Sequence, residues 1–286
     1  MSLRFFPALL LCTVCHAAPQ LLSVIGTDSS APSYSSDSIV NAATQLPGRF
    51  AEFTIATIYG QNLAFRTNVT NGDGASGLPT NLGGVSVYFD GSYAGLFYVS
   101  PTQINFLIPA ATGTGDYAVR VIRDAAAGPE AILHLDAFSP GFFGYSSNGA
   151  AANTHLVSTI VATHIDGRLV STDLPAAPAE ILVLYATGLG ATIPAQIPGR
   201  VPLKAAAISA SSLIKILIDG VASDAANILY AGITPGFSGL YQINLRLPAV
   251  ISSHPAVQIQ FGTIISPPAK LAAVGTFPPP AAFQLQ

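Results

Sequence analysis

Cysteine is nearly absent from this chain of 286 residues, and both copies, Cys12 and Cys15, lie close to its start. Beyond residue 17 the chain can therefore form no internal disulfide and no thiolate metal site, so its domains must be held by their hydrophobic cores. Tryptophan is absent, and charged residues make up only 9% of the chain, against roughly 25% in an ordinary soluble domain. The net charge is −3 without a basic run, which argues against nucleic acid and anionic membranes as partners.

Long apolar runs are also missing after residue 17. No stretch of about eighteen residues is free of Gly, Pro and charge, so no membrane-spanning helix is expected. Glu and Lys, which support helices, are scarce, whereas 26 Gly, 22 Pro, 15 Phe and 10 Tyr are present. This composition favours short strands joined by tight turns. The length permits two domains, each with its own core.

The first seventeen residues have the order of a secretory signal peptide. Arg4 precedes the apolar residues 5–14, a run too short to span a bilayer, and small side chains at Cys15 and Ala17 fit a cleavage site. A buried first strand or helix fits this order less well. Lipid attachment at Cys12 is disfavoured because Leu11 stands where a small residue is needed. We therefore expect a secreted protein, located outside the cell, in a periplasm or at the cell surface.

A seven-residue segment occurs twice in the chain. Residues 103–109 read QINFLIP, and residues 242–248 read QINLRLP. In each copy apolar side chains alternate with the amides, which predicts a strand that is half buried in a core. Pro109 and Pro248 lack the N–H group that a central ladder needs, so each marks a strand's end.

Other features repeat around this segment in the same order. Tyr59 and Tyr185 end two apolar runs, and the pairs Asp90-Gly91 and Asp219-Gly220 each separate two alternating runs. Asp-Gly in this position is a strong signal for a β-hairpin, because both residues accept positive φ. The spacing between the copies grows steadily, so the additional residues fall in loops. This pattern predicts an all-β protein that arose by tandem duplication of one small sandwich domain.

Several short motifs resemble a known family. They are residues 39–43 (IVNAA), 58–63 (IYGQNL), 82–85 (LGGV), 98–106 (YVSPTQINF) and 184–190 (LYATGLG). Their combination is similar to the uncharacterised C-terminal domain of secreted proteins from Solibacter and other acidobacteria, over residues 38 to 275. The resemblance implies a pair of immunoglobulin-like β-sandwiches of the IPT/TIG kind, and it implies no activity.

These observations divide the chain into six parts. We predict a signal peptide at 1–17, a lead-in segment at 18–45, a first immunoglobulin-like domain at 46–141, a connector at 142–178, a second immunoglobulin-like domain at 179–276 and a tail at 277–286. The connector should contain a hairpin, because residues 164–170 place a polar turn between apolar residues.

Patterns that carry catalytic or cofactor chemistry are incomplete in this sequence. Residues 72–77 (GDGASG) fit a dinucleotide fingerprint, but Leu78 and Pro79 follow where a helix is required, which favours a loop. Residues 236–239 (GFSG) lack the spacing of a nucleophile elbow. The histidines beyond residue 17 are scattered and form no zinc motif: His134, His155, His164 and His254. We expect no cofactor, no metal and no enzymatic activity.

The duplicated amides are the most attractive polar residues: Gln103, Asn105, Gln242 and Asn244. They can either bind a ligand or tie loop backbone to the strand. The structural role is favoured because both copies retain them, so replacing either Asn should destabilise its domain by a similar amount. Tyr59 and Tyr185 are interpreted in the same way, as rings that line the core and hydrogen-bond a backbone carbonyl.

The function that the sequence favours is a secreted, non-enzymatic binding or spacer module. Its expected partner is an unidentified protein or glycan at the cell surface. One alternative is a carbohydrate-binding module that uses Tyr88, Tyr93 or aromatic residues in the loop 62–82, although the absence of Trp argues against it. A second alternative is an extracellular hydrolase with a site at the domain junction, because catalytic carboxylates can come from distant strands.

The signal peptide leads to a direct prediction. Mass spectrometry of the exported protein should find an N-terminus at or near Ala18, because the small residues before it suit signal peptidase. An exported protein that still begins at Met1 would contradict the expected compartment.

Overall fold

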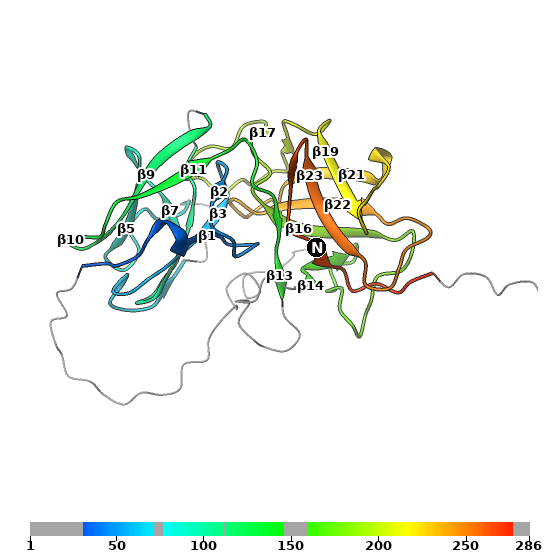
Figure 1. Cartoon of the computed structure of the whole chain (residues 1–286), viewed down its shortest axis with the longest axis horizontal. Coiled ribbons are helices and arrows are strands. Elements are labelled where there is room, and N and C mark those ends of the chain that lie inside the picture. The colour runs from blue at the N-terminus through cyan, green and yellow to red at the C-terminus, as the bar shows by residue number, and fades with distance from the viewer. Residues whose placement is uncertain (1–30, 71–76, 111–112, 146–158, 277–286) are drawn as a thin grey trace, which may run out of the picture.

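The computed structural model describes residues 31–70, 77–110, 113–145 and 159–276, which form two β-sandwiches lying side by side (Figure 1). In these residues the only helical segments are two short 3-10 turns, η1 (Ser36–Ser38) and η2 (Ala225–Asn227). The all-β fold with two tandem sandwiches is therefore confirmed. The proposed signal peptide, the tail and residues 71–76 lie outside the described part of the chain. Within that part no helix has the length and apolar character needed to cross a membrane.

The first sandwich consists of two sheets. Sheet I contains, in spatial order, β1 (Ile39–Asn41), β3 (Ile55–Tyr59), β8 (Gln103–Leu107), β7 (Gly95–Val99) and β4 (Asn68–Val69). Sheet II contains β2 (Arg49–Phe50), β11 (Ala131–Leu135), β9 (Gly115–Arg123), β5 (Val85–Phe89) and β6 (Ser92–Tyr93), and β10 (Ala126–Ala127) also pairs with β9. Neighbouring strands are antiparallel except β2 and β11, which are parallel.

The second sandwich also has two sheets. Sheet III contains β12 (Gly141–Phe142), β16 (Ile181–Thr187), β22 (Tyr241–Arg246), β21 (Ile228–Ile233), β18 (Ala207–Ile208) and β17 (Thr192–Ile193), and β15 (Ala162–His164) also pairs with β16. Sheet IV contains β13 (Gly144–Tyr145), β14 (Thr159–Ile160), β25 (Ala269–Lys270), β23 (Ala256–Phe261), β19 (Ile214–Ile218) and β20 (Val221–Ala222), and β24 (Ile264–Ile265) also pairs with β23.

The predicted connector takes part in the second sandwich. Its described residues supply β13, β14 and β15, and β12 begins just before it. The expected hairpin is present, since the N–H of His164 donates to the carbonyl of Arg168 at 2.9 Å and Thr163 pairs with Leu169. The lead-in segment likewise supplies β1 to sheet I.

Alternation of side chains explains how each strand contributes to a core. On β5, Val85, Val87 and Phe89 are buried between the sheets, whereas Tyr88 faces solvent. Burying an aliphatic or aromatic side chain of this size contributes roughly 1.5–3 kcal/mol. Each sandwich has its own large apolar cluster, the first around Phe50 and Phe106 and the second around Tyr241 and its neighbours.

The repeated strands lie at equivalent points of the two sandwiches. Tyr59 pairs with Gln103 in sheet I, and Tyr185 pairs with Gln242 in sheet III. The strand on the other side of each amide strand carries a β-bulge, between Leu96 and Tyr98 in β7 and between Ile228 and Tyr230 in β21. A bulge bends its strand and increases the local twist, so the two copies share irregularities as well as strand order.

The two Asp-Gly turns have the backbone conformation that the sequence predicts. Asp90 and Gly91 have φ of 36° and 95°, and Asp219 and Gly220 have φ of 50° and 79°. Each Asp N–H donates to the adjacent long strand, at 2.9 Å to Ala118 and at 2.8 Å to Ala256. The hydroxyl of Ser252 and the N–H of Ala256 also donate to the Asp219 carboxylate, and these bonds lower the pKa of Asp219.

These turns generate a stability prediction. Gly91→Ala and Gly220→Ala should each destabilise the protein by about 1 kcal/mol, because an alanine is strained at these φ values. A Cβ atom added at either glycine would meet no other atom within 4 Å, so the cost comes from the backbone alone. Urea denaturation measures the effect, with Ser92→Ala on exposed β6 as a control. Unchanged stability in both glycine variants would contradict the assigned turn geometry.

Candidate functional site

The junction between the sandwiches is built from apolar side chains. Phe53, Ile55, Leu78 and Leu107 of the first sandwich are buried in one cluster, and Phe97 and Phe143 pack against it. Ile55 and Leu107 point away from the core of the first sandwich, so the outer face of sheet I meets the second sandwich. The two sandwiches therefore share an apolar contact that is separate from both cores.

Buried hydrogen bonds cross the same junction. The hydroxyl of Thr187 accepts from the N–H of Ile55 at 3.0 Å and donates to the carbonyl of Gly239 at 2.8 Å. Beside it, and within the first sandwich, the amide of Asn41 donates to the carbonyl of Ser139 at 2.9 Å and fixes the segment where the chain leaves that sandwich. Thr187 and Asn41 are almost fully buried, and the hydrogen bonds offset the cost of burying these polar groups.

Two glycines allow the backbones to approach at the junction. A Cβ atom on Gly239 would overlap with the side chain of Leu107 and lie 2.9 Å from Ile55 Cγ1. A Cβ atom on Gly188 would overlap with the carbonyl oxygen of Ser139. Gly239 and Gly188 also have positive φ, of 70° and 75°, which favours glycine on conformational grounds as well.

The junction offers no catalytic arrangement among the described residues. The contacts described above are apolar or are hydrogen bonds of backbone, Thr and Asn groups, and the carboxylate of Glu52 lies close enough to Tyr241 to act on its phenol. The nearby phenol of Tyr241 is fully buried, donates to the carbonyl of Gly190 and accepts from Gln196, and burial raises the pKa of Tyr241. No group of three His, Asp or Glu side chains in the described ranges could hold a metal ion.

The duplicated amides lie on the outer faces of sheets I and III. The side-chain amide of Gln103 donates to Asn105 Oδ1 at 2.9 Å, and that of Gln242 donates to Asn244 Oδ1 at 3.1 Å. The sequence suggests bonds to loop backbone, but the observed bonds run along the strand. Residues i and i+2 lie on one face of a strand, so each Gln reaches the Asn of its own segment. The hydroxyl of Thr57 also donates to Asn105, at 3.0 Å.

Tyr59 and Tyr185 lie beside these amides and outside the two cores between the sheets, although Tyr185 is buried in a smaller apolar cluster with Val161 and Leu240. Ile58 and Leu184 occupy the core positions, so alternation directs both tyrosines to the outer faces. The hydroxyl of Tyr59 donates to the side chain of Gln45 at 2.8 Å, and Tyr185 is hydrogen-bonded to the side chain of Thr163. Burial raises the pKa of both phenols. Their partners are side chains, whereas the sequence suggested a backbone carbonyl.

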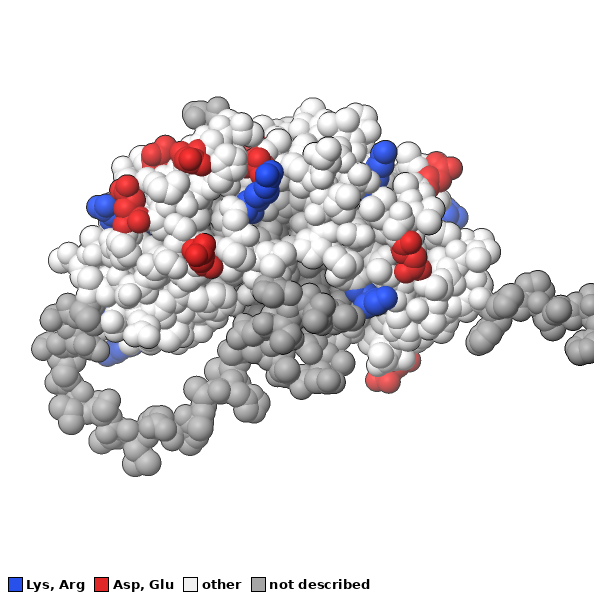
Figure 2. All heavy atoms as spheres, viewed as in Figure 1, with Lys and Arg blue, Asp and Glu red and all other residues white. Residues whose placement is uncertain are grey.

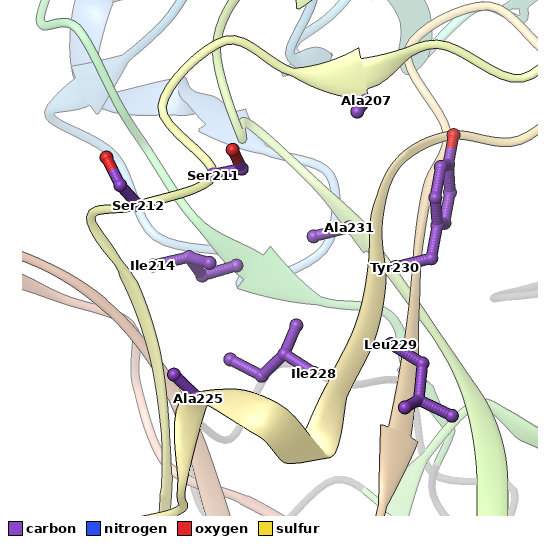
Figure 3. A pocket seen from close by; sticks show the side chains of 9 residues that line it. All are labelled: Ala207, Ser211, Ser212, Ile214, Ala225, Ile228, Leu229, Tyr230 and Ala231. Carbon is purple, nitrogen blue, oxygen red and sulfur yellow. The ribbon is translucent and has the colours of Figure 1, made fainter.

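A pocket of about 270 Å³ opens at one end of the second sandwich (Figure 3). Its lining is mostly apolar and includes Ile214, Ile228 and Ala231. Figure 3 shows the hydroxyl groups of Ser212 and Tyr230 pointing away from the middle of this space. Ligand sites usually add a few convergent polar groups to an apolar lining, so this pocket does not have the form of one.

An exposed aromatic pair lies on the outer face of sheet II. Tyr88 and Tyr93 face each other across β5 and β6, with ring centroids 5.5 Å apart and planes at 71°. On its other side, Tyr88 of β5 is the cross-strand partner of Arg120 on β9. The guanidinium of Arg120 forms an ion pair with Glu130 at 3.1 Å. The sequence pointed to the two tyrosines, but not to Arg120 and Glu130, because the register of β5 against β9 could not be read from it.

Charge is sparse on the surface around these features. On the face shown in Figure 2, Lys and Arg side chains stand apart from one another and form no basic area.

The amides give a prediction with an internal comparison. Asn105→Ala removes the acceptor of the buried Thr57 hydroxyl and should destabilise the first sandwich by about 1–3 kcal/mol. In the second sandwich Val183 stands at the position of Thr57, so Asn244→Ala should cost only about 0.5–1 kcal/mol. Hydrogen exchange measured separately on each sandwich distinguishes the two effects. Equal losses, as the sequence alone suggests, would show that the Thr57 bond adds little.

Comparison with known families supports the fold. Residues 38–133, which cover most of the first sandwich, match the model of the IPT/TIG domain family. No curated protein matches the sequence.

The solved structures that match this chain are only distantly similar to it. The surface glycan-binding protein PbSGBP-B from Prevotella bryantii is 9% identical with a TM-score of 0.26, over 85% of this chain and 42% of that one. The Bacteroides ovatus protein SGBP-B, solved with a mixed-linkage heptasaccharide, is 11% identical with a TM-score of 0.22, over 91% and 46%. Domains 5–6 of the S-layer protein SbsC are 12% identical with a TM-score of 0.24, over 90% and 99%. The chain thus spans less than half of either glycan-binding protein, and likenesses at this level carry no conclusion about its ligand.

Proposed function

We propose that the chain is a secreted, non-enzymatic module in which two immunoglobulin-like sandwiches form one rigid spacer that presents a binding surface. The observation that carries this proposal is the built junction, in which the buried Thr187 hydroxyl joins Ile55 to Gly239. Domains within one chain usually move relative to each other unless their interface is large and hydrophobic. A junction with its own apolar cluster and satisfied polar groups restricts that motion.

The secreted location is part of the same proposal. It is supported by the charge-then-apolar order of the first residues and by a fold that needs no cysteine beyond residue 17. We also propose, from the resemblance of residues 98–106 and 184–190 to the acidobacterial C-terminal domains, that both sandwiches belong to that family. The hydrolase alternative receives no comparable support, because the observed contacts at the junction bring together no nucleophile and base.

Small-angle X-ray scattering tests whether the two sandwiches form one rigid body. The wild-type protein should scatter as a single elongated particle of fixed shape. Gly239→Ala should broaden the distribution of shapes, because the added methyl group collides with Leu107 and Ile55 across the junction. Hydrogen exchange of the Ile55 N–H, which donates to Thr187, should accelerate in the same variant.

Gly236→Ala provides a matched control. Gly236 lies in the same loop and has a similar positive φ of 88°, but nothing lies within 4 Å of its Cβ position. Its backbone strain is therefore comparable, while the junction stays intact. Flexible scattering by the wild type, or equal scattering by the two variants, would contradict the proposed rigid spacer.

A further inference from the structure

The internal duplication separates features that the fold needs from features that only one copy has. The paired amides, the Asp-Gly turns and the β-bulges occur in both sandwiches. The exposed aromatic pair, Tyr88 and Tyr93, occurs only in the first sandwich. At the positions of Tyr88, Tyr93 and Arg120, the second sandwich has Leu217, Ala222 and Gln258, which pair with one another in the same way. Because the second sandwich folds without these groups, the fold does not explain them.

These side chains form one row across sheet II, here called the tyrosine row: Tyr93, Tyr88, Arg120 and Glu130. Tyr93, Tyr88 and Arg120 lie on the neighbouring strands β6, β5 and β9, and Glu130 directly precedes β11. Strands in a sheet lie about 4.8 Å apart, so the row extends roughly 14 Å. Tyr88 is 38% exposed and Tyr93 is 52% exposed, although burying a large aromatic side chain would contribute more to stability. The Arg120–Glu130 ion pair is also exposed, and such pairs contribute little to stability. The row is therefore available to a ligand.

We propose that the tyrosine row binds a neutral oligosaccharide. A pyranose ring presents weakly positive C–H groups on its faces, which suit the negative face of a tyrosine ring. Its hydroxyl groups both donate and accept hydrogen bonds, so they match a guanidinium donor beside a carboxylate acceptor. The ion pair contributes no net charge, which favours a neutral sugar over an acidic one.

The composition of the row also argues against a protein partner. A stable protein interface buries about 800 Å² on each side, and its centre is depleted in charged residues. The tyrosine row is narrow, and its ion pair lies directly beside the rings. This inference rests on the proposed non-enzymatic role, to which it adds a ligand class and a location.

Binding can be tested on the full exported chain. The probes are soluble oligosaccharides of glucose, mannose, xylose and galactose, first on an array and then by isothermal titration calorimetry. We expect binding to at least one of them without turnover. Tyr88→Ala and Tyr93→Ala should each weaken that binding about tenfold, a loss of about 1.4 kcal/mol, whereas Tyr93→Phe should stay within about threefold because the ring remains.

Leu217→Ala is the matched control, because Leu217 occupies the position of Tyr88 in the second sandwich. It should bind like the wild type, and melting curves should show that every variant is folded. Absence of binding to all four sugar classes, or equal binding by the wild type and both Tyr→Ala variants, overturns the proposal. Small-angle X-ray scattering tests the rigid spacer independently of sugar binding. A wild-type protein that is rigid but binds no sugar would therefore refute only the ligand site.

Discussion

The two-residue period of the central strands is the constraint on which the rest of this structure depends. Successive side chains of β3 and β8 point to opposite faces of sheet I. Ile58 and Ile104 thereby enter the core, while Ile55 and Leu107 are left on the outer face. A single β-sheet thus supplies apolar side chains to two contacts, the core of its own sandwich and the junction with the next one.

The same face serves different purposes in the two copies. Leu107 at the end of β8 packs in the junction, whereas the equivalent residue at the end of β22 is Arg246, which is exposed. Phe53, two residues before β3, is buried in the junction, whereas Ala179, two residues before β16, is exposed, although both have a φ near 60°. The backbone has been kept while side chains diverged, so the junction depends on a few apolar residues of the first copy.

Much of the fold could be predicted because it rests on local patterns. The alternation around Gln103 and Gln242 and the turn chemistry of Asp90 and Asp219 were sufficient to predict strands at these places and two similar sandwiches, but not the order of the strands within each sheet. The junction could not be predicted in this way. The contacts of Thr187 and Gly239 depend on how two distant segments approach each other, and no local pattern encodes that approach. The prediction for Tyr59 was wrong for a related reason, since a tyrosine at the end of an apolar run fits either face.

The duplication also changes how a chain without catalytic motifs can be read. A residue that both copies retain at one register position is explained by the shared fold, as the Gln–Asn pairs are. A group of residues that one copy has and the other lacks must be explained by something else, either the contact between the copies or a ligand. Leu107 and Phe53 are explained by the contact between the copies, because they pack in the junction cluster. Tyr88 and Tyr93 lie on sheet II, exposed and outside the junction cluster, so the contact between the copies does not account for them, which is the ground for proposing a ligand there.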